Sequence, residues 1–195
     1  MKDWTGNRRS TFATLGASSH ADHDRETNDF YATAPKAAEM LLEVESGLTD
    51  IWEPACGAGH LAKVFAQYGK LAVASDLIDR GHGKPNIDFL QCNRCHNGDI
   101  VTNPPFRYAL EFVQKALELI PDGRKVCMFL RIQFLEGKAR RKFFDEHPPQ
   151  TVYVFTSRIK CAINGNFEAT KGSAALYAWF VWQKGWKGET RVWWI

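Results

Sequence analysis

The sequence predicts an α/β domain built on a mostly parallel β-sheet with helices on both faces. Apolar runs of strand length alternate with amphipathic runs of helix length along most of the chain, and this alternation is typical of parallel strands joined by crossover helices. With 195 residues and an apolar share of 45%, the chain can bury one full core. The first stretch is polar and lacks an apolar period, so we expect a flexible arm over residues 1–27 and one domain over residues 28–195.

The first half of this domain contains two predicted helices and four predicted strands. Helices are expected at residues 34–45 and 60–68, where apolar side chains recur at i, i+3, i+4 and i+7 and share one helix face. These side chains are Ala37, Met40, Leu41 and Val44, and then Leu61, Val64, Phe65 and Tyr68. Short apolar runs predict strands at residues 51–53, 70–75, 87–90 and 99–102.

The second half continues the alternation of strands and helices. The predicted elements are helix 107–120, strand 125–131, helix 138–146, strand 151–156 and strand 175–183. The side chains that indicate them are Leu110, Val113, Leu117 and Ile120 at helical spacing, and Tyr177, Trp179 and Val181 in strand alternation. Pro148 and Pro149 separate helix 138–146 from the strand that follows.

The tetrapeptide Asn103-Pro104-Pro105-Phe106 follows predicted strand 99–102 and therefore lies at its carboxyl end. Two consecutive prolines remove backbone N–H donors, and the residue before a proline is extended, so the Pro104 carbonyl is presented as an acceptor. The Asn103 side chain offers a second acceptor, and Phe106 offers a flat face for stacking. The motif predicts a pocket for a planar amine, although alone it would also suit a turn leaving a strand.

A glycine-rich turn links predicted strand 51–53 to predicted helix 60–68. Gly57 and Gly59 permit a tight turn and allow a ligand to approach the backbone at the helix N-terminus. The next strand ends at Asp76, where a carboxylate can accept hydrogen bonds from the ribose of an adenosine. Alone, this unit fits NAD as well as S-adenosylmethionine.

Four segments in this order resemble amino-methyltransferases that use S-adenosyl-L-methionine, most closely DNA adenine-N6 methyltransferases. They are Glu53-Pro-Ala-Cys-Gly-Ala-Gly59, Ser75-Asp76-Leu77, Asp88-Phe89-Leu90 and Asn103-Pro-Pro-Phe106. The resemblance implies a Rossmann-like methyltransferase fold with a seven-stranded, mostly parallel sheet. It also implies that the last strand, 175–183, lies antiparallel between strands 125–131 and 151–156. A nicotinamide enzyme becomes the lesser alternative.

The resemblance implies a role for each matching residue. Asn103, Pro104, Pro105 and Phe106 form the catalytic pocket, with Asn103 also near the cofactor and Phe106 stacking on the substrate. The implied cofactor contacts are Tyr31, Thr33, Glu53, Ala55, Gly57, Gly59, Asp76, Leu77, Asp88 and Phe89. Each also has an ordinary interpretation: the two acids could be loop residues, Leu77 and Phe89 core side chains, and Thr33 a helix N-cap.

The charge distribution favours a nucleic-acid substrate. Residues 1–120 hold 12 Lys and Arg against 16 Asp and Glu, whereas residues 121–195 hold 13 against 6. The polar segment before the last predicted strand is expected to contact substrate through Arg158, Lys160, Asn164 and Asn166. The chain has no room for a separate recognition domain, so recognition is loop-borne, supplied by a partner subunit, or loose.

Cysteine content and polarity bear on metal sites and location. Cys92-x-x-Cys95-His96 resembles a haem-attachment motif or part of a zinc-binding motif. A zinc site needs two further ligands, so no metal is expected. Five cysteines without an apolar leader suggest reduced thiols in the cytoplasm, and no segment is apolar enough to predict a membrane contact. The small size is similar to methyltransferases of bacteria and their viruses.

Three other functions remain open at this stage. The same tetrapeptide also serves enzymes that methylate RNA adenine or a protein glutamine amide, and cytosine N4 is a further target. The second alternative is a nicotinamide oxidoreductase, in which the glycine turn would bind NAD and not S-adenosylmethionine. The third alternative is a catalytically silent nucleic-acid-binding subunit on the same scaffold.

Overall fold

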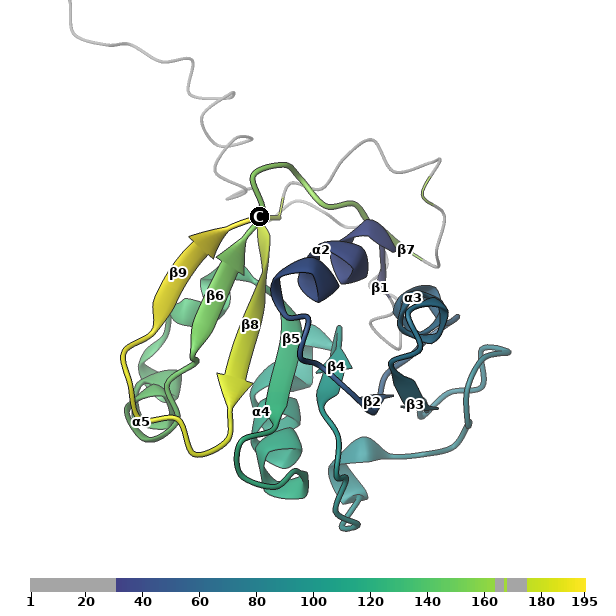
Figure 1. Ribbon diagram of the computed structural model, residues 1–195, viewed down its shortest axis with the longest axis horizontal. Coiled ribbons are helices and arrows are strands. Elements are labelled where there is room, and N and C mark those ends of the chain that lie inside the picture. The colour runs from purple at the N-terminus through teal and green to yellow at the C-terminus, as the bar shows by residue number, and fades with distance from the viewer. Residues whose placement is uncertain (1–30, 164–166, 168–174) are drawn as a thin grey trace, which may run out of the picture.

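The structure of the protein is a computed structural model that describes residues 31–163, 167 and 175–195 (Figure 1). Its main feature is a seven-stranded sheet with the strand order β3-β2-β4-β5-β8-β6-β9. The strands are β2 (Ile51–Glu53), β3 (Leu71–Ala74), β4 (Ile100–Thr102), β5 (Lys125–Arg131), β6 (Thr151–Val154), β8 (Tyr177–Gln183) and β9 (Arg191–Trp194). The predicted arm over residues 1–27 and the predicted substrate residues Asn164 and Asn166 lie outside the described ranges.

Most neighbouring strands of this sheet are parallel. β2 pairs in parallel with β3 and β4, β4 with β5, and β6 with β9. β8 runs antiparallel to both β5 and β6 and lies between them. The predicted α/β class, the mostly parallel sheet and the antiparallel position of strand 175–183 are therefore confirmed.

Helices cover both faces of the sheet, as predicted (Figure 1). They are α2 (Lys36–Val44), α3 (His60–Gln67), α4 (Ala109–Leu119) and α5 (Lys138–Glu146). Side chains of β5 alternate between the two cores: Met128 packs in the core that contains α4 and α5, and Phe129 packs in the core that contains α2 and α3. Among the described residues, no helix is both long and apolar enough to cross a bilayer.

The predicted strand at residues 87–90 is wrong. The Asp88 side chain accepts a hydrogen bond from the Leu90 backbone N–H at 3.0 Å and starts a short 3-10 helix, η1 (Phe89–Gln91). This local side-chain bond competes with strand geometry at a place where the sequence shows only an apolar run. The seventh strand is instead β9, at the outer edge of the sheet and exposed along its length.

A second, two-stranded sheet was not predicted. β1 (Tyr31–Thr33) pairs antiparallel with β7 (Cys161–Ile163). The backbone N–H of Ala34 continues this pairing by donating to the Lys160 carbonyl at 3.1 Å. This small sheet holds β1 near the carboxyl ends of the parallel strands, where open α/β sheets bind their ligands.

Candidate functional site

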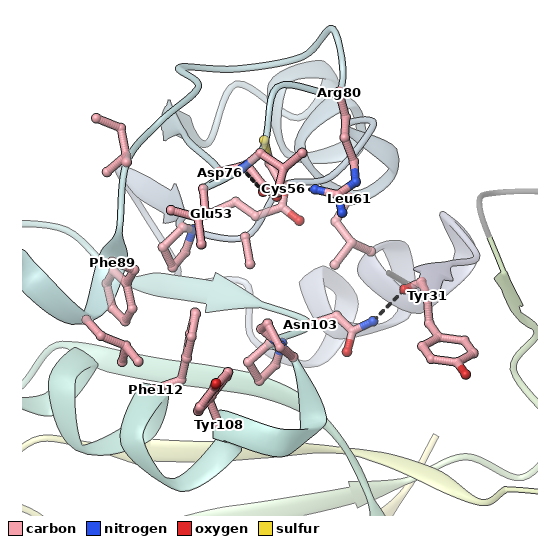
Figure 2. A pocket seen from close by; sticks show the side chains of 18 of the residues that line it. Tyr31, Glu53, Cys56, Leu61, Asp76, Arg80, Phe89, Asn103, Tyr108 and Phe112 are labelled. Atoms are coloured by element: carbon pink, nitrogen blue, oxygen red, sulfur yellow. Dashed lines mark hydrogen bonds and ion pairs between the residues drawn. The ribbon is translucent and has the colours of Figure 1, made fainter. Parts of the chain in front are cut away.

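A cavity of about 490 Å³ lies at the carboxyl ends of the parallel strands and has the size of a small-molecule site (Figure 2). It brings together most of the residues that the sequence predicts for the cofactor and the catalytic pocket. The predicted residues that line it are Tyr31, Thr33, Glu53, Ala55, Asp76, Leu77, Asp88, Phe89, Asn103, Pro104, Pro105 and Phe106. The motifs of one predicted site thus share one hollow.

The Asn103 carboxamide follows β4 and is held by β1. Its Nδ2 donates to the Tyr31 carbonyl and to Thr33 Oγ1, both at 2.9 Å (Figure 2). Because a backbone carbonyl can only accept, the NH2 group must face β1. Asn103 Oδ1 is buried and has no partner in the described part of the chain. An acceptor left in this state is costly unless a ligand satisfies it.

The carbonyls of the two neighbouring prolines differ in whether a hydrogen bond within the fold uses them. The Pro105 carbonyl accepts from the Tyr108 backbone N–H at 2.9 Å and begins the 3-10 helix η2 (Phe106–Tyr108). The Pro104 carbonyl has no hydrogen-bond partner among the residues that the structure describes. Two acceptors, Asn103 Oδ1 and the Pro104 carbonyl, therefore stay available beside the cavity.

The Thr33 hydroxyl orients Asn103, so Thr33→Val is expected to lower the turnover of the methyl transfer that the sequence resemblance implies about 3- to 10-fold, the range set by one net hydrogen bond. Valine keeps the shape of threonine, so the affinity for S-adenosylhomocysteine is expected to stay within twofold. Turnover and calorimetric titration measure the two quantities.

The matched control for this variant is Thr102→Val. The Thr102 hydroxyl is buried without a partner in the described residues, directly before Asn103. Its removal is expected to leave turnover unchanged. Equal losses in both variants would contradict a specific role for Thr33.

Glu53 is a fully buried carboxyl at the end of β2. Burial is the main reason that its pKa is raised well above the ordinary value, and the nearby Asp76 charge acts in the same direction, while the Ala62 backbone partly opposes both. Its Oε2 has no partner among the described residues. A buried, unpaired carboxyl favours a ligand cation or N–H donor at this point of the cavity.

Glu53→Gln tests this burial through the pH dependence of stability. A carboxyl whose folded pKa is raised binds its proton more tightly in the folded state, so stability falls as the pH rises above the ordinary pKa of 4.5. Glutamine has no such proton. We therefore expect the variant to have the same Tm as the wild type near pH 4.5 and a higher Tm at pH 8.

Thermal unfolding of both proteins across this pH range measures the effect. Glu43→Gln, at an exposed position of α2, is the control and should show no pH-dependent difference. A variant that is less stable than the wild type at pH 8 would show that Glu53 is ionised in the folded protein.

Asp76 organises the loop that follows β3. Its Oδ2 accepts from the Gly57 backbone N–H at 2.8 Å, and its Oδ1 accepts from the Ile78 N–H at 2.9 Å. Arg80 pairs with the same Oδ1 at 3.2 Å. Asp76 is buried, with 8% of the residue exposed, and its two oxygens link the glycine turn to the β3 loop beside the cavity.

Gly57 and Gly59 shape this turn and do not line the cavity themselves. Both have positive φ, +54° at Gly57 and +80° at Gly59. A Cβ at Gly59 would overlap the His82 ring. The turn therefore requires glycine at this position for its backbone and for its packing.

The remaining predicted cofactor residues differ in exposure. Leu77 is 55% exposed and offers an open apolar face to a ligand. Asp88 is exposed but uses one oxygen to cap η1. Phe89 is buried and packs edge-on against Trp52 at 5.2 Å, so it belongs to the core as well as to the cavity wall.

Two predicted substrate residues, Arg158 and Lys160, are exposed and do not line the cavity. They precede β7, close to β1 through the Lys160–Ala34 backbone bond. Their contact with substrate stays a prediction.

Sequence reasoning missed several residues that line the cavity: Cys56, His60, Leu61, Arg80, Arg107, Tyr108 and Phe112. Arg80 pairs with Asp76 within the loop after β3, where no helical spacing could have indicated the contact. Burial, with the charges of Glu53 and Asp76, raises the pKa of Cys56 to about 12, so this thiol stays protonated at neutral pH.

All five cysteines are free thiols, and no metal-binding group of three or more His, Cys, Asp or Glu occurs within the described ranges.

No family model and no curated protein matches the chain. Its fold is similar to a candidate RNA methyltransferase from Pyrococcus horikoshii, with a TM-score of 0.56 and 15% identity over 92% of this chain and 98% of that one. A candidate class I S-adenosylmethionine-dependent methyltransferase from Listeria monocytogenes gives a TM-score of 0.57 and 14% identity over 96% and 71%. The chain therefore has a Rossmann-like methyltransferase fold.

A third structure with this methyltransferase fold is the modification subunit of a candidate type I restriction enzyme from Vibrio vulnificus. Its TM-score is 0.55 at 15% identity, over 93% of this chain and 49% of that one. At these identities the likeness concerns the fold. The chemistry has to be argued from the cavity itself.

Proposed function

We propose that this protein transfers a methyl group from S-adenosylmethionine to the exocyclic amine of a nucleobase, with adenine N6 in DNA as the principal target. The observation that carries the proposal is Asn103, whose NH2 group is engaged by β1 and whose Oδ1 has no partner. With the Pro104 carbonyl it offers two acceptors, which match the two N–H bonds of a conjugated amine.

The residues around the cavity fit S-adenosylmethionine. The buried Glu53 carboxyl, with Oε2 unpartnered, suits the ammonium group of the methionine end, beside the Gly57–Gly59 turn. Asp76 suits the ribose hydroxyls, the exposed face of Leu77 suits the adenine, and the Asp88 carboxylate suits the adenine amine. When bound, this cofactor supplies an electrophilic methyl group on a sulfonium.

The role of Asn103 and Pro104 is to prepare the nucleophile. An adenine amine attacks poorly because its lone pair is conjugated with the ring. Acceptors on both N–H bonds favour a nitrogen that turns tetrahedral, which frees the lone pair for attack. Holding the reacting groups in line can lower the activation barrier by on the order of 7–11 kcal/mol. The methylated nitrogen is acidic and can release its proton to water, so the chain needs no general base.

A base in a duplex must leave the helix to reach such a pocket, at a cost of a few kcal/mol. Phe106 is half-buried, lines the cavity and can offset part of this cost by stacking. The excess of basic residues in the second half of the chain, 13 Lys and Arg against 6 Asp and Glu over residues 121–195, favours a polyanionic substrate.

Transfer of a labelled methyl group tests the proposal. Unmethylated DNA, RNA and a glutamine-containing peptide are offered separately, and the products are analysed by nucleoside and amino-acid chromatography. Label in N6-methyladenine of DNA is the expected result. Label only in RNA or in the peptide would replace the proposed substrate, and failure of S-adenosylhomocysteine to raise the Tm, with NADH succeeding, would overturn the cofactor.

A further inference from the structure

Arg131 ends β5 and places its guanidinium over the ring of Phe106. The distance from the guanidinium carbon to the ring centroid is 4.9 Å, and Arg131 is exposed. This ring is the surface on which the proposed substrate base would stack. A planar cation thus covers a face of the aromatic ring.

The backbone of Arg131 is held by its pairing with β8. β5 pairs with β4, which leads directly into Asn103, and Arg131 itself pairs with Tyr177 of β8. The Tyr177 ring lies 5.8 Å from the Phe106 ring, and the Tyr31 ring lies 6.2 Å from it. The charge of Arg131 also reaches Cys161 of β7, where it partly opposes the effect of burial on the thiol pKa. The Arg131 guanidinium therefore lies where the segment 103–106 meets the small β1–β7 sheet.

A base that stacks on this face of Phe106 must displace the guanidinium. Cation–π contacts at exposed sites are weak, so this displacement costs little. The released guanidinium remains anchored next to the flipped nucleotide. Its planar pair of N–H groups matches the two oxygens of a phosphodiester, which flanks every nucleotide in a strand.

We propose that Arg131 is a substrate-positioning residue that exchanges the Phe106 ring for a backbone phosphate beside the flipped base. The inference rests on the proposed function and narrows it, because a phosphate contact selects a nucleic-acid strand over a glutamine-containing peptide. Arg131 contributes affinity that is independent of base sequence and depends on salt.

The test measures binding of a fluorescein-labelled, random-sequence single-stranded DNA at several salt concentrations in the presence of S-adenosylhomocysteine. Loss of one phosphate contact lowers the slope of log affinity against log salt by about 0.7 for single strands. We expect Arg131→Gln to show this reduction and to bind about 3- to 10-fold more weakly at low salt, with unchanged affinity for S-adenosylhomocysteine. Arg131→Lys keeps the point charge and should keep the slope.

Arg191→Gln is the matched control. Arg191 is also exposed and also lies over an aromatic ring, Trp186, at 5.8 Å, but it begins the edge strand β9, which β8 and β6 separate from β5. Its replacement should change neither slope nor affinity. An unchanged slope in Arg131→Gln, or equal losses in both glutamine variants, would overturn the proposal for Arg131.

If the proposed function itself is wrong, the result differs from the results that would overturn only the role of Arg131. In that case the wild type binds neither the DNA nor an RNA of the same length, although S-adenosylhomocysteine still raises its Tm. If Arg131→Gln does not fold, Arg131→Met takes its place, because methionine also removes the charge and keeps an unbranched side chain.

Discussion

Asn103→Ala is expected to lower the methyl-transfer rate constant about 10²- to 10³-fold, the range found when one preorganised polar group is removed from an active site. The variant loses a buried acceptor, Oδ1, that β1 orients through the Tyr31 carbonyl and Thr33 Oγ1. Single-turnover measurement with labelled S-adenosylmethionine and DNA gives the rate constant. Titration with S-adenosylhomocysteine should give nearly wild-type affinity.

Two further variants separate chemistry from shape at this position. Asn103→Asp keeps the size of the side chain but has no N–H to donate to the Tyr31 carbonyl, so it should be as slow as the alanine variant. Asn93→Ala, at an exposed loop position, should retain full activity. Full turnover in Asn103→Ala, with cofactor affinity unchanged, would show that the carboxamide does not hold the target amine.

The sequence predicted those parts of the site that depend on local order. The tetrapeptide after β4, the glycine turn after β2 and the acid after β3 each follow a strand within a few residues. The carboxyl ends of parallel strands lie at one edge of a sheet. Asn103, Glu53 and Asp76 therefore had to lie close together if the strands before them were parallel neighbours, as predicted. Their convergence on a single cavity agrees with this expectation.

The sequence did not predict contacts that depend on distant pairing. Asn103 is bonded to Tyr31 across 72 positions of the chain, and β1 reaches it only because β1 pairs with β7. Neither strand has a periodic pattern, since each is three residues long. Tyr31 and Thr33 were predicted as cofactor contacts, and the structure adds that they orient Asn103. The placement of Arg131 over Phe106 depends in the same way on pairing between β5 and β8.

Asp76→Ala is expected to raise the dissociation constant of S-adenosylhomocysteine at least 100-fold and to lower the Tm. Hydrogen bonds to charged groups contribute about 1.5–3 kcal/mol each, and two ribose hydroxyls are proposed to donate here. The same change removes the acceptor of the Gly57 and Ile78 backbone N–H groups, which would loosen the glycine turn. Isothermal titration and thermal unfolding measure the two effects.

Asp79→Ala is the control, because Asp79 is exposed and, among the residues that the structure describes, accepts only from the Gly81 N–H in its own loop, at 2.9 Å. It should bind S-adenosylhomocysteine normally. Asp76→Asn separates the two contributions of the carboxylate. Asn can still accept from Gly57 through its oxygen, but it lacks the charge and its NH2 group would face the Ile78 N–H or Arg80. If Asp76→Asn restored the Tm and wild-type affinity together, the carboxylate would be needed only to shape the loop, and the ribose contact would belong to another residue.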